Sequence, residues 1–202
     1  MSKIVAFSGS YSKPSKTSSL VENIAKNAAE RHGSIIQHYD MSDLGSSLGL
    51  AQRVNDLDEQ AKKIIDAFAS ADALIIGSPV YKGSYPGLFK HFIDLLDPTI
   101  LYGKPILLAA SGGGQRHALV VEHQLRPLFG FFMAHSLPTA IYASSQDYSE
   151  DSKIISTELL GRIDQAVGEF SPFIGRKGTN LLQDYFNPLD QPNLQAKIQE
   201  AN

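Results

Sequence analysis

Short apolar runs alternate along the chain with longer stretches in which apolar side chains recur every three to four residues. The apolar runs predict five strands, at residues 4–7, 35–40, 72–77, 105–110 and 137–142. Runs with so few polar residues are typical of parallel strands covered on both faces. The periodic stretches predict amphipathic helices. The first follows the cap candidates Thr17 and Ser18, and the others lie at 57–71, 86–96, 117–129 and 154–170.

This alternation predicts an α/β fold with one parallel sheet and helices on both faces. Five strands alternating with helices favour the flavodoxin-like strand order 2-1-3-4-5. No internal repeat or linker interrupts the pattern, so we expect one domain over residues 1–174 and a polar tail over 175–202. In this order a ligand binds beyond the carboxyl ends of strands one, three and four. Those are the strands followed by loops rich in Ser, Gly and Pro.

The composition excludes several classes of function. The 202 residues carry a formal net charge of −3, which gives no bulk attraction to nucleic acid or to an anionic membrane. There is no cysteine, so disulfides, thiolate catalysis and zinc–thiolate sites are excluded. No apolar run approaches the roughly 20 residues of a membrane span, and residues 1–3 lead into a strand without a signal peptide. We therefore expect a cytoplasmic protein that binds neither nucleic acid nor membranes.

The loop after the first strand is rich in hydroxyl groups and leads into a helix. The residues placed to donate hydrogen bonds to a phosphate group are Ser10, Ser15, Thr17 and Ser18. The helix N-terminus adds unpaired amides and a partial positive charge, and Lys13 or Lys16 adds a full one. A hydroxyl-rich turn that only caps the helix explains the same residues equally well.

Two other phosphate-binding motifs fit this loop poorly. A Walker P-loop requires glycines where this chain has Ser10 and Ser15, although Lys16-Thr17 matches the end of the motif. The G-x-G-x-x-G of a dinucleotide site is absent. Asp40, at the end of the second predicted strand, is more typical of a turn or cap than of a ribose contact.

The loop after the third strand suits a flat ligand. Its candidate ligand-binding residues are Pro79, Val80, Tyr81 and Lys82. They bring backbone and an aromatic ring to the sheet edge, and packing in the core or at an interface is the alternative for Tyr81. The prediction places Pro86 in the first turn of the helix that follows.

The loop after the fourth strand is dominated by small residues. Its candidate ligand-binding residues are Ser111, Gly112, Gly113 and Gly114. Three consecutive glycines are costly in conformational entropy, so they are expected where backbone N–H groups approach a ligand closely. A loop that is merely flexible is the alternative.

Other catalytic arrangements are missing from the sequence. The six histidines show no metal-ligand spacing, and residues 8–10 lack the G-x-S-x-G elbow of a serine hydrolase. We therefore expect no bound metal and no serine-hydrolase nucleophile.

The three loops resemble those of a known family. The residues that carry the likeness are Gly9-Ser10 with Ser15 and Ser18, the segment 79–87 with Lys90 and Asp94, and Ser111-Gly112-Gly113. Over residues 3–142 the chain resembles NAD(P)H-dependent FMN reductases, and among them the flavin reductases of sulfonate-degrading two-component systems (the alkanesulfonate and methanesulfonate type). Broader relatives carry Pro-Glu-Tyr-Asn where this chain has Pro-Val-Tyr-Lys at 79–82. That departure favours the sulfonate type.

The resemblance implies a flavodoxin-like fold, FMN as substrate or loosely held cofactor, and NADH or NADPH as hydride donor. Hydride passes from nicotinamide C4 to flavin N5 in such enzymes, so the cofactors carry the chemistry and no catalytic side chain is expected. The likeness also implies a homodimer or homotetramer that delivers reduced FMN to a separate FMN-dependent monooxygenase. A quinone or azo reductase with tightly bound FMN and a flavodoxin-like electron carrier remain alternatives.

The predicted helix at 117–129 carries one further departure. His123 stands where alkanesulfonate-type relatives have a tyrosine that is associated with a π-bulge at a subunit interface. In carrying a histidine at this position the chain resembles the methanesulfonate-type members. The sequence therefore does not decide whether a π-bulge forms here. The segment 118–133 is apolar on several faces, which supports an oligomer, and Pro127 is expected to break or kink the helix.

Overall fold

The computed structural model describes residues 1–174, and the predicted polar tail at 175–202 lies outside them. The strands form one parallel sheet in the order β2-β1-β3-β4-β5, which confirms the predicted flavodoxin-like fold. A sixth strand also pairs with β4, so the sheet has six strands rather than the predicted five. In chain order the strands are β1 (Lys3–Ser8), β2 (Ile35–Asp40), β3 (Ala73–Pro79), β4 (Pro105–Ser111), β5 (His135–Ser136) and β6 (Ile141–Ala143).

The fifth predicted strand is wrong as one continuous element. β5 pairs with the first two residues of β4 and β6 with the last three, and the segment between them departs from the ladder. Pro138 lies in that segment and has no N–H to donate. Arginine side chains donate to the backbone carbonyl groups of this segment in place of the neighbouring strand. Arg126 donates to Leu137 at 2.9 Å and also to Pro138, and Arg162 donates to Ala140 at 2.8 Å.

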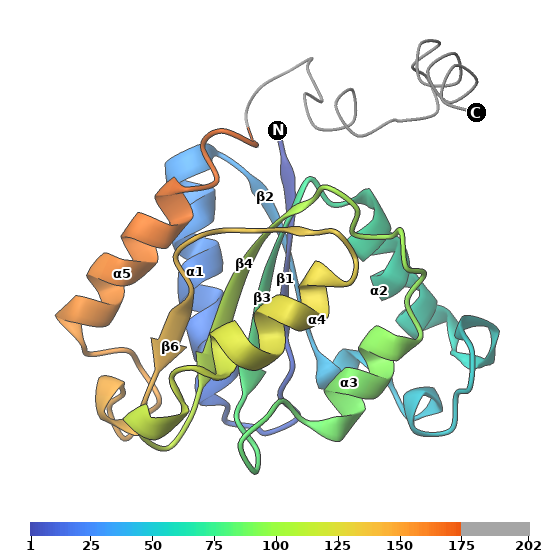
Figure 1. Ribbon diagram of the computed structural model, residues 1–202, viewed down its shortest axis with the longest axis horizontal. Helices are drawn as coiled ribbons and strands as arrows, with labels where there is room; N and C mark the ends of the chain where they lie inside the picture. Colours follow the sequence, from blue (N-terminus) through green and yellow to red (C-terminus); the bar gives the residue numbers. More distant parts are fainter. Residues whose placement is uncertain (175–202) are drawn as a thin grey trace, which may run out of the picture.

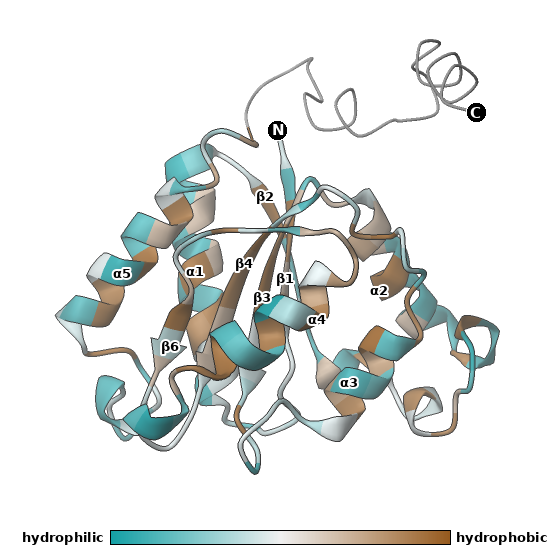
Figure 2. Cartoon of the chain, viewed as in Figure 1, coloured by the Kyte–Doolittle hydropathy of each residue, from teal (hydrophilic) through white to brown (hydrophobic). Residues whose placement is uncertain are grey.

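Helices cover both faces of the sheet (Figure 1). One face carries α1 and α5, and the other carries α2, α3 and α4. Alternate strand residues point to opposite faces, so Ile4 and Ala6 pack toward α1 while Val5 and Phe7 pack toward α2. Figure 2 shows the resulting apolar strands between helices of mixed polarity. The helices are α1 (Lys16–His32), α2 (Glu59–Ser70), α3 (Gly87–Asp94), α4 (Arg126–Gly130) and α5 (Thr157–Gly168).

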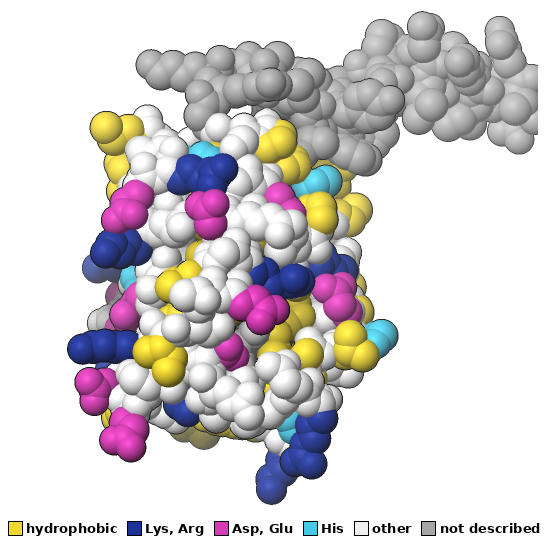
Figure 3. All heavy atoms as spheres, turned by 90° about the vertical axis from the view of Figure 1, so that its left-hand side faces the viewer, with side chains coloured by type: hydrophobic (Ala, Val, Ile, Leu, Met, Phe, Trp, Pro, Cys, Tyr) yellow, Lys and Arg dark blue, Asp and Glu magenta, His cyan; other side chains and the backbone are white. Residues whose placement is uncertain are grey.

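The face formed by α1 and α5 carries acidic and basic side chains interspersed with one another (Figure 3). A patch of one sign, which attraction to a polyanion requires, does not appear on this face. Within residues 1–174, no helix combines the length and apolarity that a membrane crossing needs.

Several predicted helix ends are corrected. α1 is capped by Ser15 rather than by Thr17 or Ser18, because the backbone of Ser15 is extended and its side chain accepts the N–H of Ser18. Pro86 is the N-cap of α3 and therefore precedes its first turn. The third and fourth strands each extend past their predicted ends, to Pro79 and Ser111. Short 3-10 helices at Met41–Leu44, Ser47–Gly49 and Val54–Asp56 lie between the second strand and the second helix, where the sequence predicted neither a strand nor a helix.

The predicted helix at 117–129 consists of three different helical segments. A 3-10 turn at Gln115–His117 is followed by a π-helix at Val121–Leu125 and then by α4. The question left open by the sequence is thereby answered, since His123 lies inside the π-helix. Pro127 does not end the helical segment, because it falls in the first turn of α4, where its missing N–H is tolerated.

Candidate active site

The carboxyl ends of β1, β3, β4 and β6 meet at one edge of the sheet, the lower edge in Figure 1. The loops that follow these strands border a pocket of about 260 Å³. Its wall contains Ser10, Ser12, Pro14, Ser15, Lys16, Thr17, Pro79, Val80, Tyr81, Ser111, Gly112, Gly113 and Ser145. The three predicted loops therefore converge on one pocket, and a fourth loop adds Ser145.

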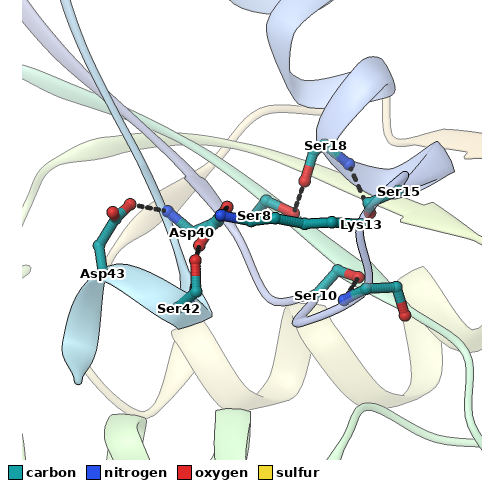
Figure 4. A network of polar contacts seen from close by, with 9 residues as sticks. Ser8, Ser10, Lys13, Ser15, Ser18, Asp40, Ser42 and Asp43 are labelled. Carbon is teal, nitrogen blue, oxygen red and sulfur yellow. Dashed lines mark hydrogen bonds and ion pairs between the residues drawn. The ribbon is translucent and has the colours of Figure 1, made fainter.

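Three predicted site residues lie outside this wall. The hydroxyl of Ser18 donates to Ser8 Oγ at 3.0 Å, beneath the first loop (Figure 4). Lys82 occupies a tight turn, and the carbonyl of Gly114 accepts the hydroxyl of Tyr142 at 2.6 Å. All three residues shape the loops that form the wall, and their direct contact with a ligand stays a prediction.

Donor groups gather where α1 begins. Ser15 Oγ accepts the N–H of Ser18 at 3.1 Å, which leaves the earlier amides of Lys16 and Thr17 without an intrahelical partner. Ser10 is almost fully buried, and its Oγ accepts the N–H of the residue two positions on at 3.2 Å, so its own hydroxyl hydrogen remains free to be donated. A helix N-terminus of this kind stabilises a bound anion.

The two lysines of the first loop have different surroundings. Lys13 Nζ lies 3.8 Å from a carboxylate oxygen of Asp40, and its side chain is mostly exposed. Figure 4 shows the two side chains next to each other. Asp40 itself caps the following 3-10 helix, which confirms its interpretation as a cap residue. Lys16 lies on the pocket wall, and its Nζ is 5.5 Å from the centre of the Tyr148 ring. Lys16 is thus the cation with an unneutralised charge on the wall.

The second loop folds into a two-residue hairpin. Tyr81 and Ser84 exchange backbone hydrogen bonds of 2.8 and 3.2 Å, with Lys82 and Gly83 at the tip. Both tip residues have positive φ, 53° and 88°, which is the geometry that a tight β-hairpin requires. Tyr81 is half exposed at 49%, and its hydroxyl lies 3.3 Å from Ser12 Oγ. The aromatic ring therefore borders the pocket and is accessible to a ligand.

The glycine loop is fastened to β6 at both of its ends. Gly112 N–H donates to the carbonyl of Ala143 at 2.9 Å, and the carbonyl of Gly114 is held by the Tyr142 hydroxyl. The amide of Gly112 is therefore already used. The amides of Gly113 and Gly114 have no partner among residues 1–174, so they remain free to bond a ligand.

The sequence interpretation missed the contributions that follow β6. Ser145 joins the pocket wall, and Tyr148 donates its hydroxyl to the Lys16 carbonyl at 3.0 Å. Burial, with a smaller effect from Asp147, raises the pKa of Tyr148, so this phenol stays protonated. The pair Ser144-Ser145 at the end of the last strand was the available signal, since it repeats the hydroxyl-rich chemistry of the first loop.

Comparison with known proteins identifies the family. Residues 2–149 match the family described as NADPH-dependent FMN reductase. An FMN reductase (NADPH) of Pseudomonas aeruginosa is 40% identical over 173 residues, covering 86% of this chain and 92% of the relative. The chain belongs to the NADPH-dependent FMN reductase family.

Two further comparisons agree with that family. The NADH-dependent FMN reductase SfnF of Pseudomonas fluorescens is 42% identical over 174 residues, covering 86% of this chain and 92% of the relative. A solved structure of an NADH:FMN oxidoreductase (EMOB), in its apo form, superposes with a TM-score of 0.78 at 28% identity, covering 88% and 92% of the two chains. The sequence-based prediction of an NAD(P)H:FMN oxidoreductase, a flavoprotein enzyme, is confirmed.

The pocket wall fits FMN on chemical grounds. The wall residues include no Asp or Glu and one lysine, together with several hydroxyl groups and the N-terminus of α1. That donor set suits a phosphate monoester. The accessible ring of Tyr81 and the free amides of the glycine loop suit a flat heterocycle with carbonyl acceptors.

Proposed function

We propose that this FMN reductase binds FMN across the pocket, with the phosphate at the start of α1 and the ring between the second and third loops. The converging donors of Ser10, Ser15 and Thr17, without a carboxylate on the wall, carry this proposal. Pro79, Val80 and Tyr81 then lie along the ring, and the amides of the glycine loop meet its pyrimidine edge.

Ser15→Asp tests the phosphate position. Aspartate also caps helices well, so α1 is retained while a negative charge is added beside the phosphate. We expect the FMN dissociation constant to rise strongly and that of riboflavin to change little. Ser15→Asn is the matched control, because asparagine caps the helix without adding charge. Equal effects of Ser15→Asp on FMN and riboflavin would place the phosphate elsewhere.

The hydride transfer from nicotinamide to flavin is chemistry that the cofactors supply. The residues of this chain hold the flavin, orient its exposed face beside Tyr81 and place amides at its polar edge. We propose that the reduced FMN then leaves for a separate FMN-dependent monooxygenase, in the cytoplasm. The openness of the pocket beside a half-exposed Tyr81 supports release, and the likeness to sulfonate-type reductases supports this kind of partner.

Purification and a nicotinamide assay separate this proposal from its alternatives. We expect a colourless protein that oxidises NADH or NADPH only when free FMN is added. A yellow protein that is active without added FMN would indicate a quinone or azo reductase with tightly bound FMN. A yellow protein that is inert toward both nucleotides would indicate an electron carrier.

We further propose a homodimer or homotetramer. Large apolar side chains on either side of the π-helix and α4 are exposed: Leu119 at 63%, Phe131 at 68% and Met133 at 58%. Exposed apolar side chains that gather along one segment are typical of protein interfaces. Light scattering on the purified protein tests the proposal, and a monomer at micromolar concentration would contradict it.

A further inference from the structure

Tyr142 has no assigned role, although it contacts the glycine loop at two points. It lies on β6, and its hydroxyl donates to the Gly114 carbonyl at 2.6 Å. The same hydroxyl oxygen lies where a side chain on residue 112 would begin. A Cβ at Gly112 would come within 3.0 Å of it, closer than real contacts allow. A side chain at residue 112 would therefore displace the Tyr142 ring, 30 positions away in the sequence, from its bond with Gly114.

Together with the bond from Gly112 N–H to Ala143, this contact fastens the first and last glycines of the loop to consecutive residues of β6. The middle glycine has no protein atom near the position of an added Cβ and lies exposed at the pocket. Anchoring the two ends restricts the orientations that the peptide planes between them can adopt. Those planes carry the two free amides, of Gly113 and Gly114.

We infer that Tyr142 is a positioning residue that sets the direction of the Gly113 and Gly114 amides toward the flavin ring. The inference rests on the proposed binding of FMN in this pocket. Amides that are held in place before the ligand arrives bind it without a further ordering cost. They also favour charge that develops at the polar edge of the ring on reduction.

The phenol is suited to this role because it stays a donor. Burial, with a smaller effect from the charge of Asp147, raises the pKa of Tyr142. The side chain is therefore protonated throughout the neutral range, and the Gly114 carbonyl keeps its partner.

Tyr142→Phe removes the hydroxyl and keeps the ring. We expect the dissociation constants of FMN and riboflavin to rise by the same factor, about fivefold, because the glycine-loop amides must then be ordered when the flavin binds. The reduction potential of the bound flavin becomes more negative, and the urea midpoint of unfolding falls modestly, because the hydroxyl also bonds the Gly114 carbonyl in the absence of flavin. A purely structural role would lower the urea midpoint and leave the potential unchanged.

A double-mutant cycle with Gly112→Ala isolates the contact. In the wild-type background the added methyl group meets the Tyr142 hydroxyl, and flavin affinity falls. In the Tyr142→Phe background the hydroxyl is absent, so the same substitution has a smaller effect. Equal effects of Gly112→Ala in both backgrounds, or unchanged flavin affinity and potential in Tyr142→Phe, would overturn the inference.

The two proposals fail in different ways. If the wild-type protein does not bind FMN at the start of α1, Ser15→Asp has no selective effect and the proposed site fails. If Ser15→Asp weakens FMN binding selectively while Tyr142→Phe does nothing, the site stands and the role of Tyr142 alone is refuted.

Discussion

The hydroxyl oxygens of Thr17 and Ser111 lie 2.7 Å apart, although 94 residues separate them in the sequence. Both side chains are buried, and both line the pocket. Two hydroxyl groups that share one hydrogen bond use one O–H between them and keep the other. The pair therefore joins the start of α1 to the loop after β4 and retains one donor for a ligand, whichever oxygen accepts.

Substitutions in this pair are expected to be non-additive. Thr17→Val preserves the shape of the side chain and removes the hydroxyl that bonds Ser111, so FMN affinity should fall about fivefold because the bond between the two loops no longer holds them in place. Ser111→Ala should cost a similar factor, and the double substitution less than the product of the two, because each single change already breaks the shared bond. Fluorescence titration with FMN measures all three. A loss of FMN affinity in the double substitution equal to the product of the two single losses would show that the two hydroxyls act independently.

The two lysines of the first loop should respond differently to removal of their charge. Lys16→Gln is expected to raise the FMN dissociation constant about tenfold, because an unneutralised cation near a phosphate is worth about 1–4 kcal/mol at contact distance. Lys13→Gln is the matched control and should change the FMN dissociation constant less than about twofold, since the ion pair with Asp40 already offsets the charge of Lys13.

Salt provides a second readout for the lysines. The difference in FMN dissociation constant between Lys16→Gln and the wild type should narrow as ionic strength rises. Lys16→Gln should leave riboflavin binding unaffected. Similar losses from both substitutions would mean that the position of the charge on the wall is unimportant.

Gly77 in β3 should tolerate no side chain. A Cβ there would come within 3.0 Å of Val21 in α1, so Gly77→Ala is expected to destabilise the protein by about 1–3 kcal/mol. Val21→Ala added to it should recover part of the loss. Gly161→Ala in α5 is the contrasting control, because that position has open space and alanine should stabilise the helix by about 0.5–1 kcal/mol. Urea unfolding compares them, and equal signs for the two glycine substitutions would refute this argument.

Low pH should weaken the ion pair between Glu122 in the π-helix and Arg126 in α4. The hydrogen bond from Arg126 lowers the pKa of Glu122 from its ordinary value of 4.5, with a smaller opposing effect from burial. A lowered pKa in the folded state gives stability that is complete above the unfolded pKa and is lost as the pH falls through the folded one. Glu122→Gln should therefore lack this part of the acid dependence.

The measurement is urea unfolding of both proteins between neutral pH and about pH 3, a range that spans the ordinary carboxyl pKa. The stability gap between the wild type and Glu122→Gln should shrink toward the acid end. A gap that stays constant with pH would show that Glu122 makes no net contribution through its charge.

The strand pattern and the local loop chemistry were enough to predict the sheet order and most of the pocket. Pro79 ends β3, Tyr81 follows it by two residues, and Ser15 lies in the loop between β1 and α1, so their place at the sheet edge follows from the fold. What remained hidden depends on contacts between distant segments. The amide of Gly112 is consumed by Ala143, and nothing near either residue in the sequence signals this.

The same limit explains the other differences. Ser15 rather than Ser18 caps α1, and the Ser18 hydroxyl donates to Ser8, a partner that the local pattern did not indicate. The broken fifth strand depends on Arg126 and Arg162, which lie on other elements and replace the ladder bonds that the segment gives up. Periodicity within the segment itself could not predict partners from elsewhere.

That break also affects how the sheet meets other chains. The edge of the sheet formed by β5 and β6 has two residues in strand geometry in β5 and three in β6, with Pro138 between the two strands. A strand from another molecule needs a continuous row of unpaired N–H and C=O groups to add to a sheet. The arginines occupy the carbonyl groups that the break frees. This edge is therefore a poor template for edge-to-edge aggregation, and a proline and two arginine side chains contribute to that protection.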